Sequence, residues 1–157
     1  MPSEAINAAT RREWRELGYF YDRDDVLKEW RILGTSQGLL EFARHIREYA
    51  SNPTNSQESE HIHIGPYWYL EIGTWPTPEI TDHWIAGPLE ALARLALQIE
   101  ESIPHLRPPA IVRLRSSFAP TSPYELVLEA QSEGFDPARA DPKCWANDAQ
   151  PIIQRDA

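Results

Sequence analysis

This sequence has a single cysteine, no long apolar run and, in its central third, very few basic residues. Its single cysteine, Cys144, excludes an internal disulfide and a zinc cage built from cysteines. No stretch approaches the roughly 18 consecutive apolar residues that span a membrane. The opening residues, MPSEAINAATRREW, also lack the apolar run of a signal peptide. We therefore expect a cytoplasmic protein that has no membrane partner.

Signatures of catalysis are missing as well. No Gly-x-Ser-x-Gly motif is present to expose a nucleophilic serine. The segment 34–38, GTSQG, can cap a helix but has neither the length nor the lysine of a phosphate-binding loop. Glu100 and Glu101 are neighbours on a predicted helix and so do not face each other. Cys144 lies beside Trp145 in an irregular region, which favours an incidental thiol. The sequence predicts no enzyme and no cofactor.

What the chain does have is enough apolar material for one packed core. Its 157 residues fit one domain, and 41% of them are hydrophobic, including six Trp, six Tyr and four Phe. Charged residues make up 25%, so the chain as a whole is not disordered. We expect a single domain over 1–157, with its core at about 19–133, a peripheral helix at 1–17 and an irregular tail at 134–157.

Two segments have the apolar spacing of amphipathic helices that pack on a core. The first runs from about Leu39 to Ala50, and the second opens at Pro88 and ends before Pro104. Their apolar faces predict a set of buried positions: Leu40, Phe42, Ile46, Leu92, Leu95, Ala96 and Ile99.

Alternation of apolar and polar residues predicts about six mostly antiparallel strands around these helices. A hairpin is expected at 19–33, with one strand running over 26–33, and the later strands lie within 61–75, 83–86, 110–115 and 124–130. Trp30, Ile32, Leu70 and Ile72 are expected to face the helices, and Trp68 joins them because it alternates with Leu70. The fold class is α+β, a two-layer sandwich of one sheet and two helices, plus the N-terminal helix.

Charge is distributed unevenly along the chain. The formal net charge is −9, which disfavours nucleic acids and anionic membranes as partners. Residues 48–106 hold nine acids and one base, Arg94, and they are also rich in Trp and Tyr. An acidic face can serve solubility alone, but acids together with aromatic anchors indicate a docking face for a basic protein. The residues expected to contact this partner are Glu58, Glu60, Tyr67, Tyr69, Glu71, Trp75, Glu79, Asp82 and Trp84.

His61 and His63 form a His-x-His pair on a predicted strand. Residues two apart on a strand point to the same side, so both imidazoles can face one metal ion. His83 can add a third ligand from a neighbouring strand. Short pairs of this kind often arise by chance, and exposed strand residues are the simpler interpretation. We therefore name these histidines as candidate ligands but predict no metal.

Four blocks of sequence carry a family resemblance: GTSQGLLEFARHIREYA (34–50), EHIHIGPYWYLEIGTWP (60–76), GPLEALARLA (87–96) and SPYELVLEAQSEGFDPARADP (122–142). They resemble a family of small bacterial proteins that is similar to the immunity proteins of polymorphic toxin systems. The likeness covers about 19–142. It implies a cytosolic, non-enzymatic α+β protein that binds and neutralises a toxin made beside it. It carries over no catalytic residue and does not identify the toxin.

Two questions stay open at this point. The protein could act as a monomer or as a homodimer. The alternative function is a small regulatory module that holds a metabolite or a metal near His61 and His63.

Overall fold

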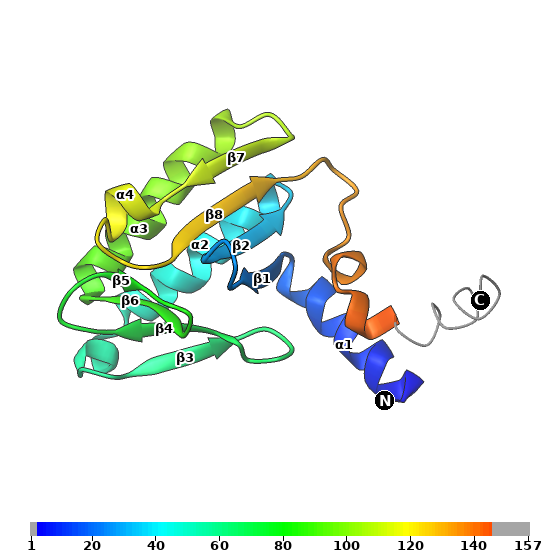
Figure 1. Ribbon diagram of the computed structural model, residues 1–157, viewed down its shortest axis with the longest axis horizontal. Helices are drawn as coiled ribbons and strands as arrows, with labels where there is room; N and C mark the ends of the chain where they lie inside the picture. The colour runs from blue at the N-terminus through cyan, green and yellow to red at the C-terminus, as the bar shows by residue number, and fades with distance from the viewer. Residues whose placement is uncertain (1–2, 146–157) are drawn as a thin grey trace.

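The computed structural model describes residues 3–145 and has an α+β fold (Figure 1). In this part of the chain the helices are α1 (Glu4–Leu17), α2 (Ser36–Ser51), α3 (Leu89–Ser102) and the short α4 (Arg115–Phe118). The strands are β1 (Phe20–Asp24), β2 (Glu29–Gly34), β3 (His61–Ile64), β4 (Leu70–Thr74), β5 (Glu79–Ile80), β6 (Trp84–Gly87), β7 (Ala110–Arg113) and β8 (Glu125–Ala130). Four short 3-10 turns complete it: η1 (Pro53–Ser56), η2 (Ile103–His105), η3 (Pro137–Ala140) and η4 (Pro142–Trp145).

The strands form two mixed sheets. The first sheet has the order β1-β2-β8-β7 and the second the order β3-β4-β6-β5. Each sheet has a parallel pair at its centre, β2 with β8 and β4 with β6, flanked by two antiparallel edge strands. The expectation of about six strands in one sheet is thus corrected to eight strands in two sheets within the described residues. Both central pairs join strands that are not consecutive in sequence, and alternation along a strand does not encode such pairings.

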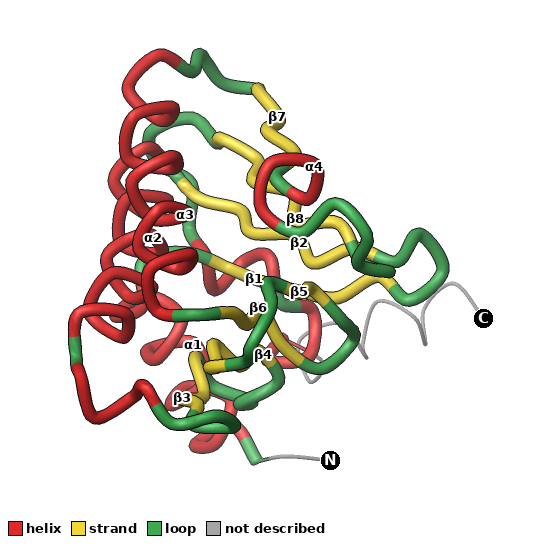
Figure 2. The backbone as a smooth tube through the Cα atoms, turned by 90° about the vertical axis from the view of Figure 1, so that its left-hand side faces the viewer, coloured by secondary structure: helices red, strands yellow, loops and turns green. Residues whose placement is uncertain are grey.

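Helices α2 and α3 pack together on one side of both sheets, as Figure 2 shows. The predicted core residues of these helices are buried, and Phe42, Ile46, Leu92 and Ile99 have no exposed surface. Leu95 and Ala96 are buried as well, as are the four predicted sheet residues, Trp30, Ile32, Leu70 and Ile72. Leu40 is the exception, because it is only half-buried.

The start of α2 is fixed by local chemistry. Thr35 caps the helix, since its Oγ1 accepts a hydrogen bond of 3.2 Å from the backbone N–H of Gly38. Gly38 lies against the turn that ends α1, and a Cβ there would sit 2.2 Å from the carbonyl oxygen of Gly18. Glycine at position 38 is therefore what lets the two helices approach so closely at this point.

The two sheets are joined directly to each other along one border. The indole Nε1 of Trp30, in β2, donates a hydrogen bond of 2.7 Å to the carbonyl of Thr81, which lies between β5 and β6. The backbone N–H of Tyr124 donates to the carbonyl of Ile80 over 3.1 Å. The Tyr21 hydroxyl donates to the carbonyl of Ile64. These bonds connect strands of the first sheet to strands and turns of the second.

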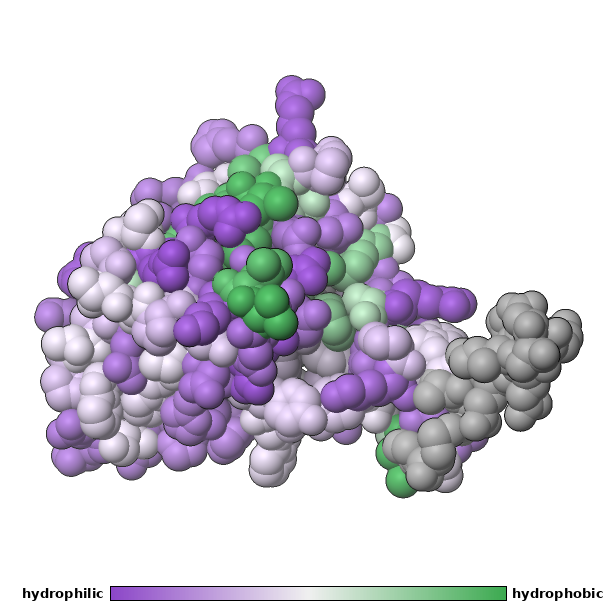
Figure 3. Space-filling view, in the orientation of Figure 1, coloured by the Kyte–Doolittle hydropathy of each residue, from purple (hydrophilic) through white to green (hydrophobic). Residues whose placement is uncertain are grey.

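Two local predictions are wrong. Trp68 was expected in the core, but it is 67% exposed. It lies in the turn between β3 and β4 with a left-handed φ of 60°, which interrupts the alternation that places Leu70 inward. The strand expected over 26–33 begins at Glu29 instead, and Val26, in the β1–β2 turn, is 92% exposed. Figure 3 shows hydrophobic side chains gathered near β7 and the β1–β2 turn on an otherwise mostly hydrophilic face.

The segment expected as an irregular tail is packed on α1 as far as residue 145. The indole Nε1 of Trp14 donates a 2.9 Å hydrogen bond to Asp141, and Arg15 forms a 2.9 Å ion pair with Asp136. Cys144 is buried against the same helix region. The rest of that predicted tail, 146–157, lies outside the described residues. Among the helices of residues 3–145, none has the length and apolar character needed to cross a membrane.

Candidate functional site

The face of the second sheet that points away from α2 and α3 brings several predicted residues together. Leu70, Ile72 and Ile85 are fully buried toward the helices. Because side chains alternate along a strand, Glu71 and Trp84 project from the opposite side. We call this surface the outer face and define it by eight residues: His61, His63, Trp68, Glu71, Trp75, Glu79, His83 and Trp84.

Trp84 lies flat on this face and is held there from two sides. A Cβ on Gly73 would come within 2.3 Å of its ring, so the glycine supplies the space that the indole occupies. The indole Nε1 donates a 2.6 Å hydrogen bond to Glu79. The ring of Trp75 packs against that of Trp84 with centroids 5.7 Å apart. Trp84 is only 7% exposed, so its ring forms the buried base of the outer face.

Glu71 occupies the centre of the outer face among histidines. Its side chain is 12% exposed, and its two oxygens lie 3.5 Å from Nε2 of His61 and 3.4 Å from Nδ1 of His83. His63 is directly opposite Glu71 across the β3–β4 pair, and its ring stacks on Trp68 at 5.5 Å. Among residues 3–145, no lysine or arginine forms an ion pair with Glu71. The carboxylate is thus buried with imidazoles as its nearest basic groups.

The remaining predicted acids border the outer face. Glu58 and Glu60 are exposed on the approach to β3, and Asp82 is exposed in the turn before β6. Glu79 is half-buried because it accepts the bond from Trp84. No lysine or arginine occurs in the sequence between Arg47 and Arg94, so the whole second sheet carries no basic side chain other than histidine. Glu60 lies opposite Thr74, whose hydroxyl bonds Tyr49 of α2, and so it lies on the α2 side of β3. The other predicted acidic and aromatic residues share one surface, with two exceptions.

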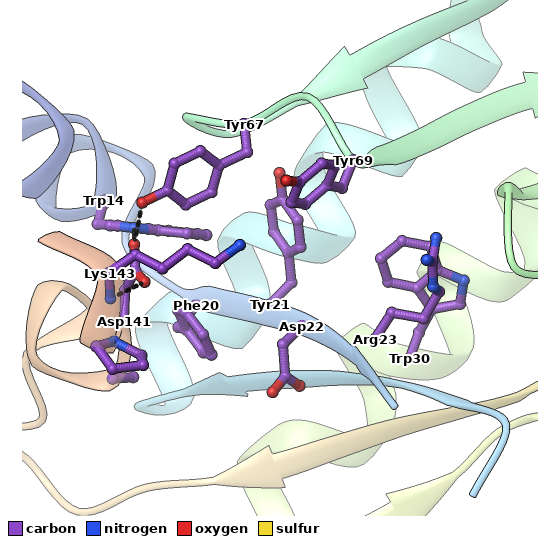
Figure 4. A pocket seen from close by; sticks show the side chains of 12 residues that line it. Trp14, Phe20, Tyr21, Asp22, Arg23, Trp30, Tyr67, Tyr69, Asp141 and Lys143 are labelled. Atoms are coloured by element: carbon purple, nitrogen blue, oxygen red, sulfur yellow. Dashed lines mark hydrogen bonds between the residues drawn. The ribbon is translucent and has the colours of Figure 1, made fainter. Parts of the chain in front are cut away.

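The exceptions are Tyr67 and Tyr69, which line a separate pocket. This pocket has a volume of about 470 Å³ and lies between β1, α1, the β3–β4 turn and the η4 region. Figure 4 shows Tyr67 reaching from the β3–β4 turn toward Trp14 and Asp141, and Tyr69 lying next to Tyr21 of the first sheet. We call it the aromatic pocket. It belongs to the border between the sheets rather than to the outer face.

Hydrogen bonds and burial set the charge state of this pocket. The hydroxyl of Tyr67 donates a 2.6 Å bond to Asp141, and burial together with this bond raises the pKa of Tyr67 well above its usual value. The Lys143 ammonium lies 5.2 Å from the Tyr67 ring and 5.3 Å from the Tyr69 ring. Burial also raises the pKa of Asp22, and its Oδ1 has no hydrogen-bond partner among the described residues.

Comparison with protein-family models, curated proteins and solved structures gives no match.

The only cysteine of the sequence lies in an environment that makes its thiol unreactive. Cys144 is buried, and its thiol lies 3.3 Å from the carbonyl oxygen of Asp141. Burial raises the pKa of this thiol to about 11, so it is protonated near neutral pH and is a poor nucleophile there.

The aromatic pocket was missed at the level of sequence. Its apolar residues were visible as the run 19–21 and as Trp14, but its polar residues Asp141 and Lys143 come from the segment expected to be an irregular tail. The Asp136-Pro137 and Asp141-Pro142 pairs were an available signal, because an Asp before a proline often caps a short turn. What brings that turn to β1 is its packing on α1, which no local pattern encodes.

Proposed function

We propose that this protein is a non-enzymatic immunity protein that binds and neutralises a basic toxin through the outer face of its second sheet. The observation that carries the proposal is a sheet face that none of the helices in residues 3–145 covers, on which three tryptophans adjoin carboxylates and no lysine or arginine. The proposal places it in the cytoplasm, as a monomer or a homodimer, where it would protect the cell that makes the toxin.

Charge would act mainly on the encounter between the two proteins. Glu58 and Asp82 are exposed at two borders of the outer face, Glu58 beside Trp75, and neither side chain forms an ion pair with another described residue. Their field is therefore available to a basic partner and would accelerate association at low salt. Raising the ionic strength shortens the range of this field to about 8–10 Å near physiological salt, which should slow association.

Aromatic groups would supply most of the affinity. Trp68 is the most exposed of the three tryptophans on this face, at 67%, and it is preoriented by stacking on His63. A large, rigid side chain of this kind loses little conformational freedom on binding and buries much apolar area. Trp68 thus takes the anchor role that was predicted for Tyr67 and Tyr69, while Trp84 packs against Trp75 elsewhere on the same face.

The test starts by identifying the partner and ends with kinetics. The tagged wild-type chain captures its partner from source cells, mass spectrometry identifies it, and binding of the purified pair is measured across a salt series. Replacing Glu58 and Asp82 together by lysine should slow association and flatten its salt dependence. Glu79 is left unchanged because it holds Trp84. Trp68→Ala should speed dissociation and cost about 2 kcal/mol or more of binding free energy.

A matched control keeps the change in net charge the same. Glu13 and Glu16 are exposed on α1, outside the outer face, and lysine at both positions shifts the charge equally. This control should bind with a clearly smaller loss of association rate. Equal losses in the two charge-reversed proteins, or a captured partner that the protein does not inhibit, would contradict the proposal.

A second candidate function is a small ligand-binding regulatory module that uses the aromatic pocket. The rings of Tyr67 and Tyr69, which already lie against the Lys143 ammonium, favour an organic cation as the ligand. In this case Lys143, which now lies over the two rings, would be displaced. Thermal stabilisation of the wild type by such cations, lost in Tyr67→Ala and kept in Trp68→Ala, would favour this module over the immunity protein.

A further inference from the structure

We propose that the outer face holds a divalent transition-metal ion, bound by His61, His63 and Glu71. Zinc is the metal that we expect. The proposal concerns the free protein and is independent of whether a toxin binds this face.

Strand register brings the four residues together. His63 lies directly opposite Glu71 in the antiparallel β3–β4 pair, and His61 lies two residues away on the same side of β3. On the other side of β4, the parallel pairing sets Glu71 beside Trp84, so that His83 reaches the same carboxylate. Strands β3 and β4 thus present His61, His63 and Glu71 to one point of the outer face, and His83 contacts the second oxygen of Glu71.

The donor atoms are already nearly close enough for one ion. The ligand atoms of His61, His63 and Glu71 all lie within 4.8 Å of one another. Tetrahedral zinc with bonds of about 2.0–2.1 Å requires donor atoms roughly 3.3–3.5 Å apart. Both histidines are exposed on the surface, so small rotations of their rings can close the remaining distance without moving the strands.

The tautomers of the two histidines favour coordination. Nδ1 of His61 lies 3.0 Å from the carbonyl oxygen of Ser59, and Nδ1 of His63 lies 3.1 Å from that of Trp68. A carbonyl oxygen only accepts hydrogen bonds, so Nδ1 carries the proton in both rings. The lone pair of each neutral ring is therefore on Nε2, and backbone bonds of this type are what orient histidine ligands in metal sites.

The buried carboxylate of Glu71 requires a positive charge close to it. A carboxylate that is removed from water is costly unless a cation or hydrogen bonds compensate it. Among the described residues, its only ion-pair partners are two histidines, which are positively charged only when protonated. A divalent ion supplies that positive charge while the histidines stay neutral, which is also the form in which they bind metal.

The donor set indicates which metals fit. Two or three imidazole nitrogens with one carboxylate suit Zn²⁺, Ni²⁺ or Cu²⁺, whereas Mg²⁺ and Ca²⁺ prefer sites built from oxygen. With three protein ligands, the fourth position is available to water.

The experiment titrates the metal-free full-length chain with Zn²⁺ by calorimetry and with Co²⁺ by visible absorption. We expect one equivalent of Zn²⁺ with a Kd in the micromolar range or below, and the strong absorption of tetrahedral Co²⁺. His63→Ala should weaken zinc binding by about tenfold or more, and Glu71→Gln should do the same. His105→Ala removes an exposed histidine of η2, outside the outer face, and should leave the affinity unchanged.

Two results would overturn the proposal. One is the lack of saturable binding by the wild type up to about 100 μM zinc, far above the range expected for a histidine–carboxylate site. The other is binding that His63→Ala does not weaken, which would place the metal elsewhere. Circular dichroism of each variant verifies folding, and the exposed position of His63 keeps the test valid even if Glu71→Gln unfolds.

Discussion

The two sheets follow one plan but carry different outer surfaces. Each has a central parallel pair with antiparallel edges, and each buries its inner face against α2 and α3. On the first sheet, acids are neutralised across strands, since Arg31 pairs with Glu129 at 2.8 Å and Arg113 with Glu29 at 3.6 Å. On the second sheet, Glu71 meets only histidines. The shared strand arrangement and the buried inner faces account for the stability of both sheets. The difference in charge pairing leaves the outer face of the second sheet, and not that of the first, free to bind a partner.

The largest effect should come from the core that both sheets share. Leu92 on α3 is fully buried, so Leu92→Ala should lower the free energy of unfolding by about 2–5 kcal/mol. Leu97, on the same helix, is 47% exposed, and Leu97→Ala should cost no more than about 1 kcal/mol. Urea denaturation followed by circular dichroism measures both. Similar losses in the two variants would show that α3 packs through a different face.

The next largest effect should come from the packing of the Trp84 ring over Gly73 on the second sheet. Gly73→Ala places a methyl group against the ring of Trp84, which its bond to Glu79 holds in place. We expect a loss of about 1–3 kcal/mol through overpacking and a change in near-ultraviolet circular dichroism. In a Trp84→Ala background the same substitution should cost much less, because the ring is gone. Equal costs in both backgrounds would mean that the indole does not lie over Gly73 in solution.

A smaller effect tests the paired charges of the first sheet. Arg31 and Glu129 lie on adjacent strands and are partly exposed, so a double-mutant cycle with alanine should give a coupling of about 0.2–1 kcal/mol. The coupling should shrink in about 1 M salt, where the screening length falls to about 3 Å. No measurable coupling at low salt would weaken the contrast between the two sheets.

The smallest effect should be a pH dependence of folding stability that comes from Asp22, on the edge strand β1 of the first sheet. Burial raises the pKa of Asp22 above 3.8, although Arg31 opposes the shift, so folding favours the protonated carboxyl. Its contribution to stability is therefore complete below about pH 3.8 and is lost as the pH rises through the folded-state pKa. Asp22→Asn should then raise stability at neutral pH, by less than about 1 kcal/mol because the side chain is half-exposed and solvent screens it. This gain should vanish near pH 3.

Asp136 provides the opposite sign as a control. Its hydrogen bonds with Arg15 lower its pKa, so its contribution is present at neutral pH and is lost on acidification. Asp136→Asn should therefore reduce stability near pH 7 and have little effect at low pH. If both asparagine variants changed stability in the same direction at pH 7, the environments assigned to the two carboxyls would be wrong.

Local patterns predicted the parts of the fold that depend on local periodicity. The helix residues Phe42, Ile46, Leu92 and Ile99 are buried as their spacing indicated, because a striped helix can bury only one side. The prediction that Trp68 is buried was wrong, because its left-handed backbone conformation in a turn reverses the side to which alternation assigns the residue. The grouping of strands into two sheets was also missed, since it depends on pairings between distant segments.

The candidate site was predictable to a similar extent. The composition of 48–106 indicated an acidic, aromatic surface, and Glu71, Trp75, Glu79 and Trp84 do lie on one face. Composition could not assign Tyr67 and Tyr69 to a different pocket, because the β3–β4 turn directs Tyr67 toward Trp14 and Asp141 and places Tyr69 next to Tyr21. Nor could it show that Glu71 is buried among three histidines, which follows from the register of three strands.

The parallel pairing of β2 with β8 has a consequence for the order of events during synthesis. The second sheet is built entirely from residues 61–87, so all of its strands leave the ribosome together. The first sheet joins residues 20–34 to residues 110–130, and β2 can pair only with β1 until β8 emerges. Closing this long loop costs entropy before its contacts form. On the growing chain, β2 therefore has an unpaired edge while the second sheet is already complete, and that edge is where nascent chains on one messenger would first associate.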